Sequence, residues 1–321
     1  MMALLMGGLV GVVALTSILT ATALGIWFER KLSARMQTRL GPTIVGPFGL
    51  LQPIADFLKL LQKETLIPDG ADRLLFVVAG PFCIFLALAT AAFVPISPDT
   101  GLGLDSGLIF VVAFGAITVI PIWMAGWASR NKWALLGGMR AVAQAVSYAV
   151  PLVLAALVPV LLAGTLSLDG IVAAQQGFHW FALWPTFPGL PAFVLYLGCL
   201  LAEANRIPFD IPEAESELVA GITTEYTGMR FGFFYLAEYV HTLVGSAVAA
   251  TLFLGGWDGP IAPGLHWLVA KTLVLYTVIY WIRWSFLRLR ADQLMSLCWR
   301  YLVPAGLALV FAAAALAQVM P

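Results

Sequence analysis

Long runs of apolar residues, separated by short polar segments, dominate the chain. A helix that crosses the hydrocarbon core of a bilayer needs about 20 consecutive, mostly apolar residues. Segments of that kind predict eight transmembrane helices, at about 4–28, 73–95, 107–128, 139–163, 190–206, 231–254, 267–287 and 300–319. We therefore expect an all-α integral membrane protein that forms a single multi-pass domain over residues 1–321.

A different periodicity marks residues 41–64, between the first two predicted membrane helices. Two Gly-Pro turns precede Gln52 and Pro53, which open a helix predicted over 53–63. Its apolar positions follow the spacing i, i+3, i+4, i+7 and are Ile54, Phe57, Leu58 and Leu61. Its other face carries Asp56, Lys59, Gln62 and Lys63. Such an amphipathic helix lies along the membrane interface or packs on a soluble neighbour, and both arrangements can hold at once.

The charged residues predict how the helices are oriented. All but one of the 17 Lys and Arg residues lie in or beside the odd-numbered loops. The even-numbered loops contain no Lys or Arg and instead carry Asp99, Asp105, Asp169 and Asp258. The positive-inside rule therefore places the long odd loops in the cytoplasm, so that both termini are periplasmic. The first apolar stretch lacks a basic start and a small-residue cleavage site, and we interpret it as a retained helix.

Composition narrows the class of protein further. A mean hydropathy of +0.94 is typical of an integral membrane protein. The formal net charge of zero argues against a basic nucleic-acid binder. Cys83, Cys199 and Cys298 are scattered and form no C-x-x-C motif, so we expect neither a self-contained iron–sulfur or zinc site nor any metal site. The three histidines are too few and too dispersed to suggest haem ligation.

An acidic segment over residues 203–230 is the most informative part of the sequence. Arg206 is its one cation between the first and the last of six carboxylates, which are Glu203, Asp210, Glu213, Glu215, Glu217 and Glu225. Charge beside hydrocarbon is energetically unfavourable, so such clusters often mark ion paths or cofactor sites. A solvated loop between two membrane helices is the alternative interpretation.

The acidic segment also contains a predicted helix. Asp210 and Glu213 have the spacing of a capping box, Pro212 would lie in the first turn, and Gly221 would end the helix. Glu213 and Glu217 would then face each other four positions apart, which is a destabilising arrangement of like charges. Solubility alone does not require that arrangement, which favours a functional role for the segment.

Several long runs match one family. They are WFERKLSARMQTRLGP and VGPFGLLQPIADFLKLLQKE between Trp27 and Glu64, GWASRNKWALLGGMRAVAQAVSY at 126–148, TEYTGMRFGFFYLAEY at 224–239 and RLRADQL at 288–294. In this order they closely resemble the H subunit of respiratory complex I, the eight-helix membrane subunit of NADH:quinone oxidoreductase. The resemblance covers the cytoplasmic half of nearly the whole chain.

The resemblance implies a subunit without a redox centre of its own, in the inner membrane of a bacterium. Quinone is then the substrate, while NADH, FMN and the iron–sulfur clusters belong to partner subunits. In this family the first, sixth and seventh helices and the interfacial helix form the entrance of a quinone tunnel. The expected partners are peripheral quinone-site subunits, including the one with the terminal iron–sulfur cluster, small membrane subunits, antiporter-like subunits and lipids.

Candidate quinone-binding residues follow from this comparison and from residue chemistry. An apolar slot for the isoprenoid tail and a few polar groups for the headgroup are needed. The candidates are Glu29, Arg30, Arg35, Arg39, Ala55, Asp56, Phe57, Arg230, Phe231 and Phe234. Each arginine could instead bind lipid phosphate or serve the positive-inside rule.

Candidate proton-coupling residues are the charged groups of the acidic segment and one membrane carboxylate. They are Glu203, Arg206, Asp210, Glu213, Glu215, Glu217, Glu225 and Glu238. Glu238 lies about two turns into the sixth predicted helix, where a carboxylate without partners would be protonated. A structural hydrogen bond to a neighbouring helix is the alternative role for Glu238.

The chain departs from the family pattern at two positions. Thr43 replaces the Asn that usually follows the first Gly-Pro. Ala149 stands directly after Ser147 and Tyr148, where the family usually has a glutamate assigned to the proton path. The second departure affects the inferred proton coupling more than the fold or quinone access.

Two other functions compete with the quinone-reductase hypothesis. The first is the homologous membrane anchor of a hydrogenase or formate-hydrogenlyase complex, which binds no quinone. Residues 212–221 and 224–226 are of the quinone type rather than of that type. The second is a stand-alone secondary transporter, for which inverted repeats with paired interrupted helices are expected and are not seen in the sequence.

Overall fold

The computed structural model describes residues 2–97, 104–184, 186–213, 215–260 and 262–319, and the regular elements in these ranges are all helices. The helices at the predicted membrane spans are α1 (Met2–Met36), α3 (Arg73–Ala91), α4 (Gly107–Ile117), α5 (Val119–Ala128), α6 (Lys132–Ala163), α8 (Thr186–Glu203), α10 (Gly228–Phe253), α11 (Leu265–Ser285) and α13 (Val303–Val319). The other helical elements are α2 (Gln52–Gln62), α7 (Leu168–Ala174), α9 (Glu215–Leu218), α12 (Ala291–Leu297), η1 (Pro47–Gly49), η2 (Gly221–Thr223) and η3 (Cys298–Leu302). The all-helical prediction is confirmed for these ranges.

Seven stretches of the described chain are long and apolar enough to cross a membrane. They coincide with the predicted spans except the fifth, where the apolar helix Phe187–Glu203 is shorter. The prediction of a multi-pass membrane protein is therefore confirmed. The fifth of the eight predicted spans is not established, because its helix is shorter than the others. The first helix continues to Met36, beyond its predicted end, because Glu29 and Arg30 find partners on neighbouring helices.

Two of the membrane helices are interrupted. The third span consists of α4 and α5, which meet at Thr118. The Thr118 hydroxyl bonds to the backbone carbonyls of Phe114 (3.3 Å) and Gly115, and such a local bond competes with the regular helical pattern. The last span contains the π-helical turn η3 between α12 and α13. The break at Thr118 lies beside the cavity described below.

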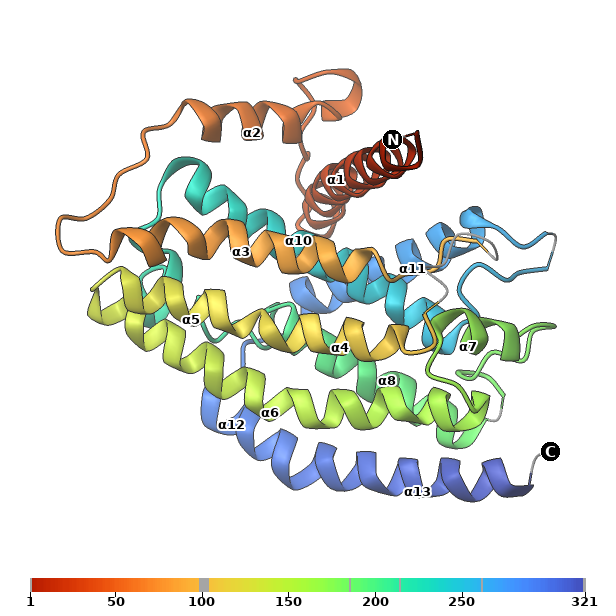
Figure 1. The fold of residues 1–321 in the computed structure, drawn as a ribbon. Coiled ribbons are helices and arrows are strands. Elements are labelled where there is room, and N and C mark those ends of the chain that lie inside the picture. The colour runs from red at the N-terminus through yellow and green to blue at the C-terminus, as the bar shows by residue number, and fades with distance from the viewer. Residues whose placement is uncertain (1, 98–103, 185, 214, 261, 320–321) are drawn as a thin grey trace.

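The helices form a bundle from which α1 stands apart (Figure 1). α6, α8 and α13 pack together on one side, and α3 and α10 lie against each other on the other. α2 leaves the end of α1 and returns alongside α10, so that α1, α2 and α10 form a corner of the molecule. We call this region the α1–α2–α10 corner.

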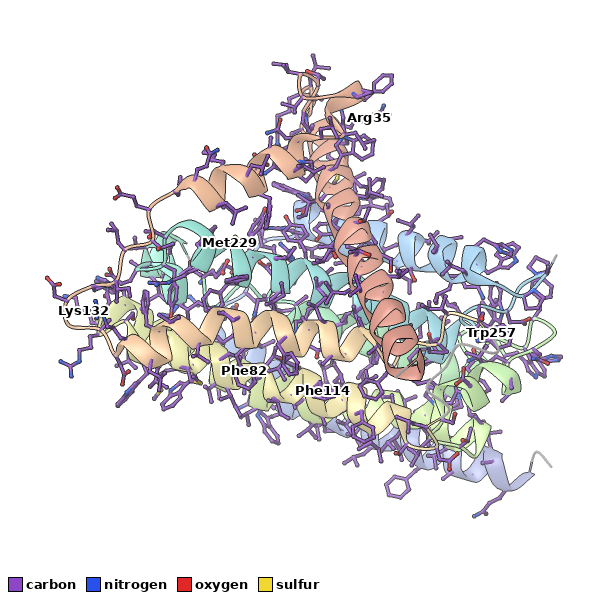
Figure 2. All side chains as sticks on the ribbon, turned by 45° about the horizontal axis from the view of Figure 1, so that its top comes forward. Arg35, Phe82, Phe114, Lys132, Met229 and Trp257 are labelled. Atoms are coloured by element: carbon purple, nitrogen blue, oxygen red, sulfur yellow. The ribbon has the colours of Figure 1, made fainter. Side chains whose placement is uncertain are left out.

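The predicted odd loops meet at one end of the bundle. The Leu66 amide donates to Thr227 Oγ1 (3.1 Å), which joins the first loop to the fifth. The Leu289 amide donates to the Pro208 carbonyl (2.9 Å), which joins the seventh loop to the fifth. Lys132 of the third loop lies at the same end (Figure 2). The first, third, fifth and seventh loops therefore share one end of the bundle, as the charge pattern predicts.

The even loops gather at the opposite end, where Figure 2 places Trp257. The Leu108 amide donates to the Leu166 carbonyl (3.3 Å), which joins the second loop to the fourth. Asp99, one of the acidic residues of these loops, lies outside the described residues. The two ends of the bundle thus differ in charge.

The helix predicted in the acidic segment is present, in the part of the chain that the structure describes, as the single turn α9 at Glu215–Leu218. Its predicted start is wrong, because residues 210–213 are not helical. Gly221 does not end α9 but begins η2, with φ +55°. A Cβ at this position would collide with the Pro212 carbonyl, so the glycine permits a tight backbone approach. The like-charge contact predicted between Glu213 and Glu217 is absent because the two side chains face different surroundings.

Candidate functional site

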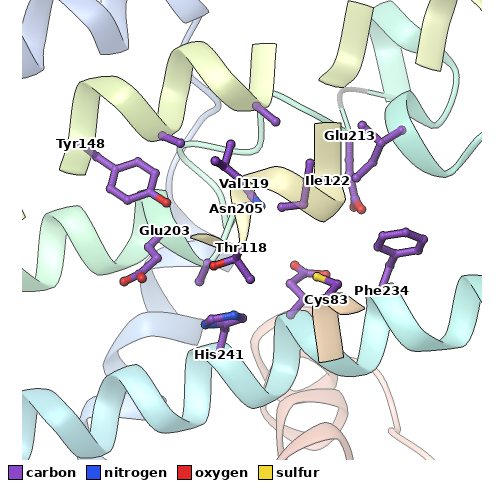
Figure 3. A pocket seen from close by; sticks show the side chains of 15 residues that line it. Cys83, Thr118, Val119, Ile122, Tyr148, Glu203, Asn205, Glu213, Phe234 and His241 are labelled. Carbon is purple, nitrogen blue, oxygen red and sulfur yellow. The ribbon is translucent and has the colours of Figure 1, made fainter. Parts of the chain in front are cut away.

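A cavity of about 50 Å³ lies inside the bundle (Figure 3). Its polar lining side chains come from four helices and the acidic segment, and they include Tyr148, Glu203, Asn205, Glu213, Glu238 and His241. Water needs at least about 10–15 Å³ per molecule and several polar partners, so about three molecules fit. A small, mostly apolar cavity that holds several titratable side chains is an arrangement expected of a proton path.

The end of α8 carries Glu203 into this cavity. Gln144 of α6 is buried and donates from Nε2 to the Ala202 carbonyl (2.7 Å) and to Asn205 Oδ1 (3.0 Å). These bonds hold the backbone at Ala202 and the side chain of Asn205, on either side of Glu203. Its carboxylate lies against Gly115, next to the break between α4 and α5, and any side chain at Gly115 would collide with it. The interrupted span therefore makes room for the carboxylate.

Arg206 forms a buried ion pair with Glu238 of α10. Its Nη1 lies 2.9 Å from Glu238 Oε1, and the Arg206 side chain is 1% exposed. The guanidinium carbon lies 4.4 Å from the centre of the Tyr239 ring and 5.5 Å from that of Tyr280. A buried cation is stable only when its charge is compensated, and here one carboxylate and two aromatic faces provide the compensation.

Glu213 turns from the acidic segment into the cavity. Burial raises the pKa of Glu213 to about 8, and the negative charges of Glu238 and Asp210 contribute to the rise. Arg206 and Arg283 act in the opposite direction on this pKa, but burial prevails. Glu213 can therefore take up and release a proton near neutral pH, which is a property expected of a proton-carrying group.

The remaining carboxylates of the acidic segment face the surface. Glu217 is exposed and accepts from Arg140 Nη1 (2.5 Å), a hydrogen bond that lowers the pKa of Glu217. Glu225 accepts from Asn131 Nδ2 (2.6 Å). The side chain of Glu215 lies outside what the structure describes. The segment thus divides into carboxylates that face the cavity and carboxylates that fasten the loop to α6.

The α1–α2–α10 corner carries both polar and apolar groups. Arg30 of α1 bonds to Asp56 Oδ2 of α2 (2.6 Å), and Gln52 holds the other oxygen of Asp56 (3.0 Å). Ala55 is half-buried beside this pair, while Phe57 is 43% exposed. The apolar face of α2 is therefore free to contact lipid or a hydrophobic ligand.

A line of charged and aromatic side chains joins this corner to the cavity. Arg283 of α11 bonds to the buried Glu29 of α1 (2.5 Å) and lies 5.9 Å from the centre of the Tyr280 ring. Tyr280 is also next to Arg206, whose partner Glu238 lines the cavity. A charge that changes near α1 can act along this line because the groups are buried and weakly screened.

Other predicted quinone-site residues lie elsewhere. Phe234 lines the cavity and packs edge-on against Tyr226 (4.9 Å between ring centres), so it faces away from α2. Arg230 lies over the Phe76 ring of α3 (5.8 Å). Phe231 stacks on Tyr235 (6.1 Å). These residues do not join the Arg30–Asp56 pair.

Arg35 and Arg39 are exposed near the end of α1, and the Arg39 Nε donates to Gln37 (2.7 Å). Their positions suit contacts with lipid phosphate as well as with a quinone headgroup. The sequence pattern did not single out Tyr148, Tyr280 or His241. Of these, His241 had a detectable signal, because it lies three positions after Glu238 and so shares its helix face.

The fold and this site define a multi-pass helical membrane protein that carries a cluster of buried, interacting acids and bases. Among the described residues, no group of three or more His, Cys, Asp and Glu side chains is arranged to hold a metal ion. The family described as NADH dehydrogenase matches residues 9–314, and the chain belongs to this family. The resemblance inferred from the sequence is confirmed.

Three bacterial relatives, each named as the H subunit of NADH-quinone oxidoreductase, illustrate the similarity. The chain is 46% identical over 292 residues to the relative from Dehalococcoides mccartyi strain CBDB1, and the alignment covers 91% of this chain and 81% of the relative. It is 46% identical over 308 residues to the relative from Anaeromyxobacter dehalogenans strain 2CP-C, covering 87% of this chain and 74% of the relative. It is 46% identical over 310 residues to the relative from Chlorobaculum tepidum strain TLS, covering 90% of this chain and 86% of the relative.

Proposed function

We propose that the chain is the membrane subunit of NADH–quinone oxidoreductase that admits quinone at the α1–α2–α10 corner and links its reduction to a proton pathway. The observation that carries the proposal is the line of side chains from Glu29 through Arg283, Tyr280 and Arg206 to Glu238. Family membership supports it, since the relatives above are named as subunits of that enzyme.

Quinone access is supported by the chemistry of the corner. The isoprenoid tail is apolar and suits the exposed face of α2 at Phe57, while the headgroup is polar and suits the Arg30–Asp56 pair. Ala55 is small and lies beside that pair, so a tail can pass over it. Electrons come from partner subunits, and this chain contributes the path that positions the headgroup.

Proton coupling is assigned to the cavity. Glu203, Glu213 and Glu238 line it, and the negative charge of Glu238 raises the pKa of Glu213. A change of charge at the corner alters the balance between Arg283 and Arg206, and therefore the proton affinity of the carboxylates next to them. Ala149 leaves α6 without a carboxylate here, and these three acids supply the titratable groups instead.

The membrane arrangement follows the charge pattern. We assign eight spans, with α8 as the short fifth one, and α2 lying in the interface. The odd-loop end faces the cytoplasm, where the peripheral subunits with NADH, FMN and the iron–sulfur clusters dock. The termini face the periplasm of a bacterial inner membrane, and small and antiporter-like membrane subunits bind along the bundle.

The experiment that tests this function blocks the quinone path. Ala55→Trp places a large ring beside the Arg30–Asp56 pair, and Gln62→Trp places the same ring on the exposed polar side of α2 as a matched control. In the intact complex, Ala55→Trp should abolish most quinone reduction and leave electron transfer to a water-soluble acceptor unchanged. Loss of both activities in an assembled complex, or of neither, would contradict the proposal.

A further inference from the structure

His241 is a buried titratable residue that the function proposed above does not use. It lies on α10 one turn after Glu238 and lines the cavity. Its Nε2 is buried and has no hydrogen-bond partner among the residues that the structure describes. A buried polar atom without a partner is destabilising by about 1–3 kcal/mol unless water or another group satisfies it.

The cavity offers such a partner. The space beside the imidazole is large enough for about three water molecules. A water bound to Nε2 could bridge to a carboxylate that shares the cavity. Neutral imidazole has one nitrogen that donates and one that accepts, so it can take up a proton and return it. The geometry therefore suits proton exchange better than simple packing.

Titratable groups enter the cavity from four helices and the acidic segment, whereas α5 and η2 contribute none. Glu238 lies on the same face of α10, Glu203 comes from α8, Tyr148 from α6, Cys83 from α3 and Glu213 from the acidic segment. In the view of Figure 3, Glu203 and Tyr148 lie on one side of the cavity, Glu213 lies on the other, and His241 lies below them on α10.

The positive charge of Arg206 is compensated by other residues. Arg206 pairs with Glu238 and stacks on Tyr239, so it has little effect on the imidazole. His241 is thus the only basic group among the side chains that line this cavity. A base that shares a water-sized cavity with several acids can pass a proton from one acid to another.

We propose that His241 carries protons between Glu213 or Glu238 and Glu203, through water in the cavity. In one cycle the Nε2 atom accepts a proton from a water or carboxylic acid, giving an imidazolium with two N–H donors. The imidazolium then donates one proton toward the Glu203 carboxylate, and the neutral ring is restored. No bond other than those to hydrogen changes, and no electron is transferred. The inference rests on the proposed function, because it names a further group in the same pathway.

The test uses His241→Gln in the intact complex, reconstituted into vesicles. Glutamine fills a similar space and keeps a hydrogen-bonding group but does not titrate. We expect proton pumping and the quinone reduction coupled to it to fall by about tenfold, which is less than the roughly 10²–10⁴-fold usual for loss of a proton-transfer group because cavity water partly substitutes. The pH profile of the rate should change as well, because glutamine does not titrate.

Two controls separate proton transfer from packing. His266→Gln changes an exposed histidine at the even-loop end and should leave rate and pH profile unchanged. Ala149→Glu, placed in the His241→Gln chain, adds a carboxylate on the face of α6 that carries Ala145 and next to Tyr148, both of which line the cavity. It should restore a substantial part of pumping.

Either of two results would overturn the inference. One is a wild-type rate and pH profile for His241→Gln in a complex whose unsubstituted form reduces quinone. The other is a loss that Ala149→Glu does not relieve although Ala149→Glu alone is active, because the loss would then come from packing. An unsubstituted complex that reduces no quinone would instead contradict the proposed function.

Discussion

Removal of Arg206 should release the acidic segment from the bundle. Arg206→Gln takes away the positive partner of Glu238 and the cation that stacks on Tyr239. Because Glu238 then remains as an uncompensated buried charge, the loss should be about 3–5 kcal/mol of local stability. At about 1.4 kcal/mol per factor of ten, the population in which residues 204–213 are open should rise by roughly two to three and a half orders of magnitude.

Amide hydrogen exchange over residues 204–213 in the intact complex measures this opening. Arg206→Gln should speed exchange at least about hundredfold, by the same free-energy relation. Adding Glu238→Gln to that chain removes the uncompensated charge and should restore most of the protection. Arg206→Lys keeps the charge but not the planar stacking, and its effect should lie between. Unchanged exchange in Arg206→Gln, or simple additivity with Glu238→Gln, would refute the coupling of these two residues.

Three further predictions concern the cavity, the acidic segment and the topology. Gly115→Ala should displace the Glu203 carboxylate and lower coupled quinone reduction. Gly11→Ala is the control, because a Cβ at Gly11 contacts no other residue, and it should leave the rate unchanged. Equal rates of the two variants in an activity assay would contradict this prediction. Burial raises the folded-state pKa of Glu213 from 4.5 to about 8, so its contribution to stability is fully present below pH 4.5 and is lost as the pH rises through about 8. Exchange over residues 204–213, corrected for intrinsic rates, should therefore increase from pH 6 to pH 9 in the natural chain and stay flat in Glu213→Gln; parallel profiles would disprove it. In a cysteine-free background, a membrane-impermeant reagent added to the periplasmic side should label Ala262→Cys and not Lys132→Cys, both of which are exposed, and the reverse pattern would invert the assigned topology.

The long apolar runs could be predicted from sequence because a membrane helix must satisfy its backbone internally and bury little charge. The fifth span was predicted to end at residue 206, but α8 ends at Glu203. It ends there because Gln144 bonds to Ala202 and Asn205, a tertiary contact that no local sequence pattern shows. The capping-box pattern at Asp210 failed for the same reason. A local preference for a helix was outweighed by burial of Glu213 in the cavity.

The sequence shows that these carboxylates belong to one segment, but not that the fold divides them between the cavity and the surface. Glu213 and Glu217 are equally plausible as charged groups along the chain, and only the fold turns one toward Glu238 and the other toward Arg140. His241 was missed although its position three residues after Glu238 was a detectable signal in the sequence. Its significance arises from the cavity that other helices enclose.

The contrast between Glu213 and Glu217 gives the most direct test of proton coupling through the cavity. Both belong to the same loop, but Glu217 is 43% exposed on its side chain and its ion pair contributes at most about 1 kcal/mol, as is usual at a surface. Quinone reduction and proton pumping should be measured together in vesicles that contain the complex with Glu213→Gln or with Glu217→Gln. The account predicts that Glu213→Gln lowers both activities strongly while Glu217→Gln keeps them near those of the natural chain. Equal activities in the two variants, whether both normal or both reduced, would contradict it.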